Sequence, residues 1–313
     1  MSSTFAIAIH GGAGTIVKEQ MSDELKSEVM TALKASVKAG HKVLSAGGDA
    51  LDAATEAVKV LEDSPHFNAG RGSVLTHQEM VEMDASVMHG REMDAGAVAG
   101  VRHVRYPIAL AKDVMQKSDH VLLIGDGAET FAFEQGHEYT EQDFFFTERR
   151  YEQLQSMKEK GLYALSESQY PDDNKFGTVG AVALDKNGNL AAATSTGGIT
   201  NKKYGRVGDS ALIGCGTYAE NGNVAVSTTG MGEYFIRKTV ASDVAARMRY
   251  LKEDVQTASE AVVQGDLKDM GGEGGLIAID AQGVIHFAMN SSGMYRASID
   301  ITGDLTLAIY ADE

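Results

Sequence analysis

Two stretches near the N-terminus carry apolar residues at every third or fourth position, which is the spacing of one helix face. The first runs from about Asp23 to Ser45, ahead of Gly47-Gly48. The second begins at Asp49, whose carboxylate can accept hydrogen bonds from the first amides of a helix. Before both, the apolar run Phe5–Ile9 predicts a strand that ends in the glycine-rich turn 10–14. The chain therefore opens with a strand and two long helices.

Shorter apolar runs follow, alternating between strand and helix patterns without an internal repeat. The pattern predicts strand material at 80–100, a helix at 107–116, a strand at 121–124 and helices at 128–134 and 151–160. Residues 137–177 are polar and acidic, and their last part, 166–175, has few residues to bury and several turn formers. We interpret this last part as an exposed linker that directly precedes Thr178.

After this linker the chain becomes rich in short apolar runs joined by tight turns. Asn187-Gly188 separates the runs 178–184 and 190–194, and Asn221-Gly222 separates 212–218 from 224–228. Asn-Gly is the pair that two-residue hairpin turns favour. Helical patterns follow at 233–251 and 255–268, and strand patterns at 276–280, 284–288 and 305–310. The fold class is therefore α/β, with a largely antiparallel second half covered by helices.

Composition narrows the range of partners. The chain has 313 residues, of which 43% are hydrophobic, so it can bury a large core and is not generally disordered. Its net charge of −16 and the lack of a basic patch make nucleic acids and anionic membranes poor partners. A single cysteine, Cys215, cannot form an internal disulfide, and the N-terminus lacks a signal-peptide pattern. We therefore expect a cytoplasmic protein.

Several common chemistries lack their motifs in this sequence. Neither Gly-x-Gly-x-x-Gly nor Gly-Lys-Ser/Thr occurs, which excludes two usual phosphate-binding loops. Gly-x-Ser-x-Gly and Ser-x-x-Lys are also missing, so two familiar serine-hydrolase classes are excluded. The nine histidines lie at least eleven residues apart, so closely spaced zinc ligands are missing as well. We interpret each histidine as a structural or surface residue.

Four segments rich in glycine and threonine remain, and the first of them directly follows the linker. They are Gly177–Gly180, Thr194–Gly198, Arg206–Asp209 and Thr228–Glu233. Each alone also fits a purely structural interpretation, because threonine favours strands and glycine favours strand ends and turns. Their joint occurrence after a polar linker points instead to a catalytic site.

A threonine hydroxyl is a weak nucleophile unless a base lies beside it. If the chain were cut between Gly177 and Thr178, the new α-amine would lie next to the Thr178 hydroxyl. Such an amine has a reference pKa of about 7.7–8, which suits a base working near neutrality. Arg206 and Asp209 could bind the carboxylate and ammonium of an amino-acid ligand, and 229–230 could offer donors to an oxyanion.

At these residues the chain resembles the plant-type asparaginases and isoaspartyl peptidases. These are N-terminal nucleophile hydrolases that mature by autoproteolysis. The resemblance spans nearly the whole chain and is poor at 137–176 and at the C-terminal tail. Its segments are His10–Gly14, Phe67–Gly72, Met83–Ala85, Ala95–Gly100, Gly177–Ala183, Ala193–Gly198, Gly205–Ser210 and Gly293–Arg296.

The resemblance implies a four-layer αββα sandwich and two subunits made from one precursor. The α subunit would span 1–177 and end in a variable linker at about 161–177, and the β subunit would span 178–313. The two would form one structural domain after autocleavage between Gly177 and Thr178. The family also implies a dimer of αβ heterodimers.

The resemblance further implies roles for the matched residues. Thr178 would be the nucleophile and Thr196 a hydroxyl that supports it, while the Thr229 hydroxyl and the Gly230 N–H would form the oxyanion hole. Gly230 would thus also bind substrate, as would four other matched positions: Arg206 at the α-carboxylate, Asp209 at the α-amine, the backbone of Gly232 near the amine, and Asn68 beside the nucleophile.

The implied substrates are L-asparagine and β-aspartyl dipeptides, from which the enzyme would release L-aspartate. The resemblance implies no organic cofactor, and a structural Na⁺ bound by backbone carbonyls. The carbonyls belong to Leu61, Glu62, Ser64, Phe67, Ala69 and Arg71.

Two other interpretations stay open at this point. One is a glycosylasparaginase-like amidohydrolase, which the missing signal peptide and the single cysteine fit badly. The other is a non-cleaving protein that binds amino acids through Arg206 and Asp209. A denaturing gel distinguishes the second, because only a processed enzyme gives two bands.

Overall fold

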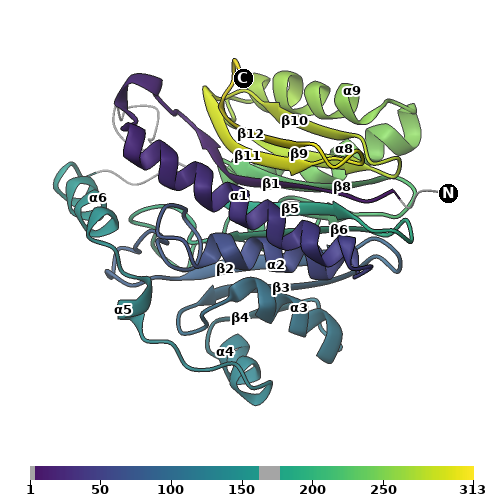
Figure 1. The fold of residues 1–313 in the computed structure, drawn as a ribbon. Coiled ribbons are helices and arrows are strands. Elements are labelled where there is room, and N and C mark those ends of the chain that lie inside the picture. The colour runs from purple at the N-terminus through teal and green to yellow at the C-terminus, as the bar shows by residue number, and fades with distance from the viewer. Residues whose placement is uncertain (1–3, 162–176) are drawn as a thin grey trace.

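The computed structural model describes residues 4–161 and 177–313, so most of the expected linker at 161–177 lies outside the described residues. The chain folds into a mixed α/β structure with two β-sheets (Figure 1). The strands of the larger sheet are β1 (Ala6–Gly14), β2 (Met83–His89), β3 (Asp94–Val101), β4 (Leu122–Ile124), β5 (Val179–Leu184), β6 (Leu190–Thr196), β11 (Gly293–Ile299) and β12 (Leu305–Tyr310). Those of the smaller sheet are β7 (Thr217–Ala219), β8 (Val224–Gly230), β9 (Gly274–Asp280) and β10 (Ile285–Met289).

Helices cover the outer faces of both sheets. Helices α1 (Asp23–Ser45), α2 (Ala50–Glu62) and α3 (Pro107–Lys117) pack on the larger sheet, and α8 (Val240–Ala246) and α9 (Val255–Glu260) pack on the smaller one (Figure 1). The inner faces of the sheets pack against each other, through β1, β5 and β6 on one side and β7, β8 and β9 on the other. The other α-helices in the described ranges are α4 (Gly125–Glu134), α5 (Gln142–Phe145), α6 (Glu148–Glu159) and α7 (Gly232–Lys238).

The first two helices begin where the sequence predicts, and each start has a side-chain cap. Ser22 Oγ accepts a hydrogen bond from the backbone N–H of Leu25 at 3.1 Å, and Asp49 Oδ1 accepts one from Leu51 at 2.8 Å. These bonds satisfy amides that lack a partner within the helix. The predicted starts of both helices are therefore confirmed.

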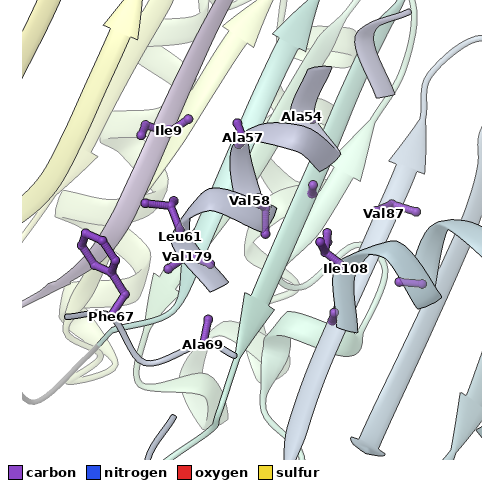
Figure 2. Close-up of a cluster of buried hydrophobic side chains, with 14 of the residues drawn as sticks. Ile9, Ala54, Ala57, Val58, Leu61, Phe67, Ala69, Val87, Ile108 and Val179 are labelled. Carbon is purple, nitrogen blue, oxygen red and sulfur yellow. The ribbon is translucent and has the colours of Figure 1, made fainter. Parts of the chain in front are cut away.

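Alternation along β1 divides its side chains between two cores. Ile7 and Ile9 belong to the core under the helices, whereas Ala6 and Ala8 belong to the core between the two sheets. Figure 2 shows Ile9 beside α2, together with Val179 from β5 and several α2 residues, Ala54, Ala57, Val58 and Leu61. Because strand side chains alternate, His10 faces the smaller sheet with Ala6 and Ala8.

The same alternation brings polar side chains from two further strands into the space between the sheets. On β6, Ala193 faces the helices and Ala192 faces the smaller sheet, so Thr194 and Thr196 also face the smaller sheet. On β8, Ala225 belongs to the core between the sheets. Residues 227 and 229 therefore point back toward the larger sheet, and a polar cluster forms at one end of an otherwise apolar interface.

Strands from before and after Thr178 are interleaved in the larger sheet, whose order is β12-β11-β1-β5-β6-β2-β3-β4. Strand β1 lies between β11 and β5, and β6 pairs with β2. Neither the segment before Thr178 nor the segment after it holds a contiguous half of this sheet.

The structure corrects four sequence predictions. Residues 10–14 continue β1 instead of forming a turn, because they pair with β11 across a bulge. The helix predicted at 233–251 is broken at Thr239, whose φ of 52° is left-handed and ends α7. The strand predicted at 212–218 shrinks to β7, and β11 was not predicted, because Arg296 and Ser298 interrupt its apolar pattern.

Candidate active site

Thr178 lies immediately before β5, with its side chain in the space between the sheets. Its hydroxyl donates a hydrogen bond to Thr196 Oγ1 at 3.0 Å. The backbone N–H of Gly198 donates to the same oxygen at 3.1 Å. Thr178 is only 9% exposed and Thr196 only 2%. The structure thus places the expected nucleophile and its supporting hydroxyl in direct contact.

Asn68 connects the segment before Thr178 to the loop after β6. Its backbone N–H donates to the Gly177 carbonyl at 3.0 Å, and its Nδ2 donates to the Gly198 carbonyl at 2.7 Å. Its Oδ1 accepts a bond from the backbone N–H of Val74 at 2.9 Å. A Cβ at position 177 would lie 2.5 Å from the Asn68 Cβ, so this approach requires glycine. The carbonyl that precedes Thr178 is therefore both fixed and polarised.

Thr229 and Gly230 end β8 opposite the glycine-rich end of β1. The Thr229 Oγ1 accepts a hydrogen bond from the backbone N–H of Ala13 at 3.2 Å. Because this oxygen accepts, its own proton remains available to donate to a ligand. A Cβ at Gly230 would lie 2.4 Å from the Glu273 carbonyl oxygen, so the close approach of these strands requires glycine.

Arg206 and Asp209 lie beside Gly232, around the start of α7. Asp209 Oδ2 accepts a hydrogen bond from the Thr228 hydroxyl at 2.7 Å. Burial raises the pKa of Asp209 to about 6, against the opposing effects of that bond and of the Arg206 charge. A Cβ at Gly232 would lie 2.9 Å from both Arg206 Nη2 and Asp209 Oδ1, so this glycine leaves room for the two charged groups.

Glu233 belongs to this site, although sequence reasoning assigned it no role. Its carboxylate accepts two hydrogen bonds from Arg206, from Nε and from Nη2, each at 2.9 Å. Burial alone would raise the pKa of Glu233, but the bonds and charge of Arg206 outweigh it and leave the pKa lowered. The available signal was its place directly after Gly232, within the glycine- and threonine-rich segment.

His10 also lies at the site, which the interpretation of the histidines as structural or surface residues did not anticipate. Its Nδ1 lies 3.0 Å from the Thr178 carbonyl oxygen and its Nε2 lies 2.9 Å from Ser227 Oγ. Burial lowers the pKa of His10 to about 3, against a smaller raising effect of the Thr178 carbonyl. His10 is therefore a neutral imidazole that contacts the backbone of Thr178 rather than its hydroxyl.

These residues enclose a cavity of about 10 Å³, which is room for about one water molecule. The cavity brings together seven expected site residues, whereas Thr229 and Gly232 lie next to residues that line it. The lining residues are Asn68, Gly177, Thr178, Thr196, Gly198, Ile199, Arg206, Gly208, Asp209, Ser210 and Gly230.

Within residues 4–161 and 177–313, no three His, Cys, Asp or Glu side chains are arranged to hold a metal ion. Nor is any helix in these ranges long and apolar enough to cross a lipid bilayer.

Comparison with known proteins gives consistent matches over most of the chain. Residues 3–309 match a family model described as asparaginase. The chain is 54% identical to an isoaspartyl peptidase of Salmonella typhimurium, over 93% of this chain and 94% of that protein. It is 44% identical to an isoaspartyl peptidase/L-asparaginase of Xenopus laevis, over 98% and 96% of the two chains. It is 45% identical to a plant-type L-asparaginase of Thermococcus kodakarensis, over 93% and 95%.

Proposed function

The chain belongs to the asparaginase family, and we propose that it is a hydrolase that releases L-aspartate from L-asparagine and from β-aspartyl dipeptides. The names of its relatives support both substrates. The observation that carries the proposal is the buried contact of 3.0 Å between the Thr178 and Thr196 hydroxyls, in a cavity lined by Arg206 and Asp209.

Activation by cleavage between Gly177 and Thr178 is part of this proposal. The Thr178 hydroxyl attacks the Gly177 carbonyl carbon, the C–N bond breaks, and the acyl group moves from nitrogen to oxygen. Water then hydrolyses the resulting ester, which leaves a Gly177 carboxylate and a free Thr178 amine. The Asn68 N–H on the Gly177 carbonyl supports this step, because it would stabilise the developing oxyanion.

In the catalytic cycle, the Thr178 amine accepts the proton of the Thr178 hydroxyl as the oxygen attacks the side-chain amide of the substrate. The Thr229 hydroxyl and the Gly230 N–H stabilise the oxyanion. The leaving amine takes the proton and departs as ammonia or as an amino acid. Water hydrolyses the acyl ester and L-aspartate leaves, while Thr196 keeps the nucleophilic oxygen oriented.

We propose that Arg206 and Asp209 select the substrate. The α-carboxylate binds N–H donors of Arg206 that Glu233 leaves available, and the α-ammonium binds the Asp209 carboxylate and the backbone near Gly232. An aspartyl group whose α-carboxylate and α-ammonium are both free can bind Arg206 and Asp209 at the same time.

The proposed subunits are residues 1–177 and 178–313, held as one domain in the four-layer αββα arrangement of N-terminal nucleophile hydrolases. Helices outside two stacked sheets and the interleaving of β1, β5 and β11 support this arrangement. Self-association as a dimer of heterodimers is proposed from the family resemblance.

β-Aspartyl-leucine should be hydrolysed, whereas α-linked Asp-Leu should not, because its α-carboxylate is consumed in the peptide bond. Arg206→Lys keeps the charge but loses the planar guanidinium, so kcat/KM should fall about ten- to a hundredfold. Release of L-aspartate measures both effects, with asparagine as a second substrate. Unchanged kcat/KM in Arg206→Lys would remove Arg206 from the site, and hydrolysis of the α-linked dipeptide would refute the proposed specificity.

A structural Na⁺ in the 61–71 loop is likewise proposed. Neutral carbonyl oxygens suit a hard cation, and the Glu62 carboxyl is turned away to accept a bond from Ser195. The Glu62 carbonyl accepts a backbone bond from Arg71, and a carbonyl oxygen has a second lone pair that could bind an ion. A Cβ at Gly72 would lie 2.8 Å from the Phe67 carbonyl oxygen, so this glycine keeps a cradle open there.

Replacing NaCl by choline chloride at equal ionic strength should therefore lower the apparent melting temperature by about 2–4 °C, because an ion that binds only the folded state stabilises it. Gly72→Ala would fill the cradle and should melt at one temperature in both salts. Equal melting temperatures for the unchanged protein in the two salts would contradict the proposal.

A further inference from the structure

A chain of buried polar side chains leads away from the Thr178 carbonyl into the space between the two sheets. It begins with His10, whose Nδ1 faces that carbonyl at 3.0 Å and whose Nε2 faces Ser227 Oγ at 2.9 Å. It continues through three more hydroxyls, each 2.6–2.7 Å from the next, in the order Thr194, Thr217 and Ser86. All five side chains belong to residues that are 0% exposed.

The protons of this chain can be assigned by counting donors. A carbonyl oxygen only accepts, so Nδ1 must carry the imidazole proton. A neutral imidazole carries one proton, so Nε2 must accept one from the Ser227 hydroxyl. A hydroxyl has one proton to donate, so Ser227 must accept from Thr194, which in turn accepts from Thr217. The Ser227, Thr194 and Thr217 hydroxyls therefore donate in the direction of His10, whereas the Ser86 proton has two acceptors at 2.7 Å, Thr217 Oγ1 and the Ser210 carbonyl.

Gly180 provides the space for the first bond of this chain. It pairs with His10 across β5 and β1. A Cβ at this position would lie 2.0 Å from Ser227 Oγ and 2.4 Å from His10 Nε2. Any larger residue would thus separate the imidazole from its hydroxyl. This explains a glycine inside a regular strand, where glycine is otherwise unfavourable.

We propose that His10 is a positioning residue: its Nδ1–H fixes the Thr178 backbone, and the buried hydroxyls hold the imidazole in that tautomer. The inference rests on the proposed role of Thr178 as nucleophile. The Thr178 carbonyl lies on the C-terminal side of the cleaved bond, so it keeps this contact in the mature enzyme. Ser227 belongs to β8, which also carries Thr229 and Gly230. The chain thus holds the nucleophile in register with the proposed oxyanion hole.

Two substitutions of His10 distinguish the contact made by Nδ1 from the contact made by Nε2. The amide nitrogen of His10→Asn can take the place of Nδ1 and donate to the Thr178 carbonyl, whereas that of His10→Gln reaches toward Ser227. We expect kcat to fall about ten- to a hundredfold in His10→Gln, since small misplacements of reacting groups cost that much. KM should change little, because Arg206 and Asp209 bind the substrate elsewhere. His10→Asn should recover about tenfold of that loss.

Two further variants leave His10 in place and disturb its partner. Gly180→Ala separates Nε2 from Ser227, and Ser227→Ala removes the donor. Both should lower kcat about tenfold or more with little change in KM. Gly127→Ala, at a helical glycine with open space around it, is the control for the first. Ser36→Ala, which removes a buried hydroxyl between α1 and α2, is the control for the second. Rates are normalised to the processed fraction on a denaturing gel.

A spectroscopic measurement tests the tautomer without relying on activity. In ¹⁵N-histidine-labelled protein, His10 should show a protonated Nδ1 and an unprotonated Nε2, with its signals identified by their loss in His10→Asn. Thr178→Ala keeps the carbonyl and should keep this tautomer. Ser227→Ala should also keep it, because the carbonyl still accepts from Nδ1, but it should shift the signal of the unprotonated Nε2, which loses its donor. A protonated Nε2 in the unchanged protein, or equal kcat losses in His10→Asn and His10→Gln, would overturn the inference. An unchanged protein that releases no L-aspartate would refute the proposed function, while the spectrum would still report the tautomer.

Discussion

Thr178→Ala should leave the chain in one piece and remove all turnover. Alanine lacks the Oγ1 hydroxyl, which is the atom that attacks Gly177 in maturation and the substrate in catalysis. Dividing 33.3 kDa between 177 and 136 residues gives fragments of about 19 and 14 kDa for the unchanged protein. A denaturing gel and an L-aspartate assay measure the two losses.

Thr178→Ser is the matched variant, because it keeps an amine beside a hydroxyl and should still process and retain some activity. Self-cleavage is wrong if purified, protease-free Thr178→Ala still separates into the two fragments. An active Thr178→Ala would exclude Thr178 as the nucleophile.

Acetylation of the Thr178 amine in the processed enzyme should abolish turnover and leave the fold intact. An acetylated nitrogen is no longer basic, so nothing would accept the hydroxyl proton as the oxygen attacks. Acetylation is carried out with and without saturating L-aspartate, which should shield the Thr178 amine from the reagent. Mass analysis of the smaller fragment then measures modification at position 178. Full activity after complete modification there would sink this mechanism.

The same mechanism gives the pH dependence of kcat/KM a definite shape. The α-amine must be unprotonated to act as the base, so activity falls as the pH drops through its pKa. Asp209 must be charged to bind the ammonium, and burial raises its pKa to about 6. The acidic limb should therefore have a slope of one at higher pH and a slope of two below about pH 6. A slope of one throughout would show that Asp209 does not titrate on this limb.

The sequence predicted the elements whose signals are local. Apolar spacing placed the start of α1, the Asp49 cap placed that of α2, and Asn187-Gly188 placed the hairpin of β5 and β6. It failed where a distant strand decides the structure. Residues 10–14 look like a turn because of their glycines, and become a strand only because β11 pairs with them. The break at Thr239 likewise comes from a left-handed residue whose type does not favour that conformation.

At the site, the sequence identified the residues that lie in recognisable glycine-rich segments. It missed the residues whose roles depend on contacts with distant parts of the chain. Thr178, Arg206 and Asp209 stand in glycine-rich segments whose chemistry can be inferred from the sequence. His10 and Glu233 gain their roles from Ser227 and Arg206, which are 217 and 27 residues away along the chain. Sequence spacing cannot reveal such pairs, because the packing of two sheets brings them together.

The interleaved order of the larger sheet would make the proposed maturation a one-way event. Once the chain is cut before Thr178, β1 still lies between β11 and β5, so the fragments cannot part without breaking hydrogen bonds along both of its edges. Unfolding would then release two separate polypeptides, and refolding would require an encounter between them instead of a search within one chain. The lifetime of the mature enzyme would be set by its unfolding rate rather than by an equilibrium. A cell could replace lost enzyme only by synthesising new precursor.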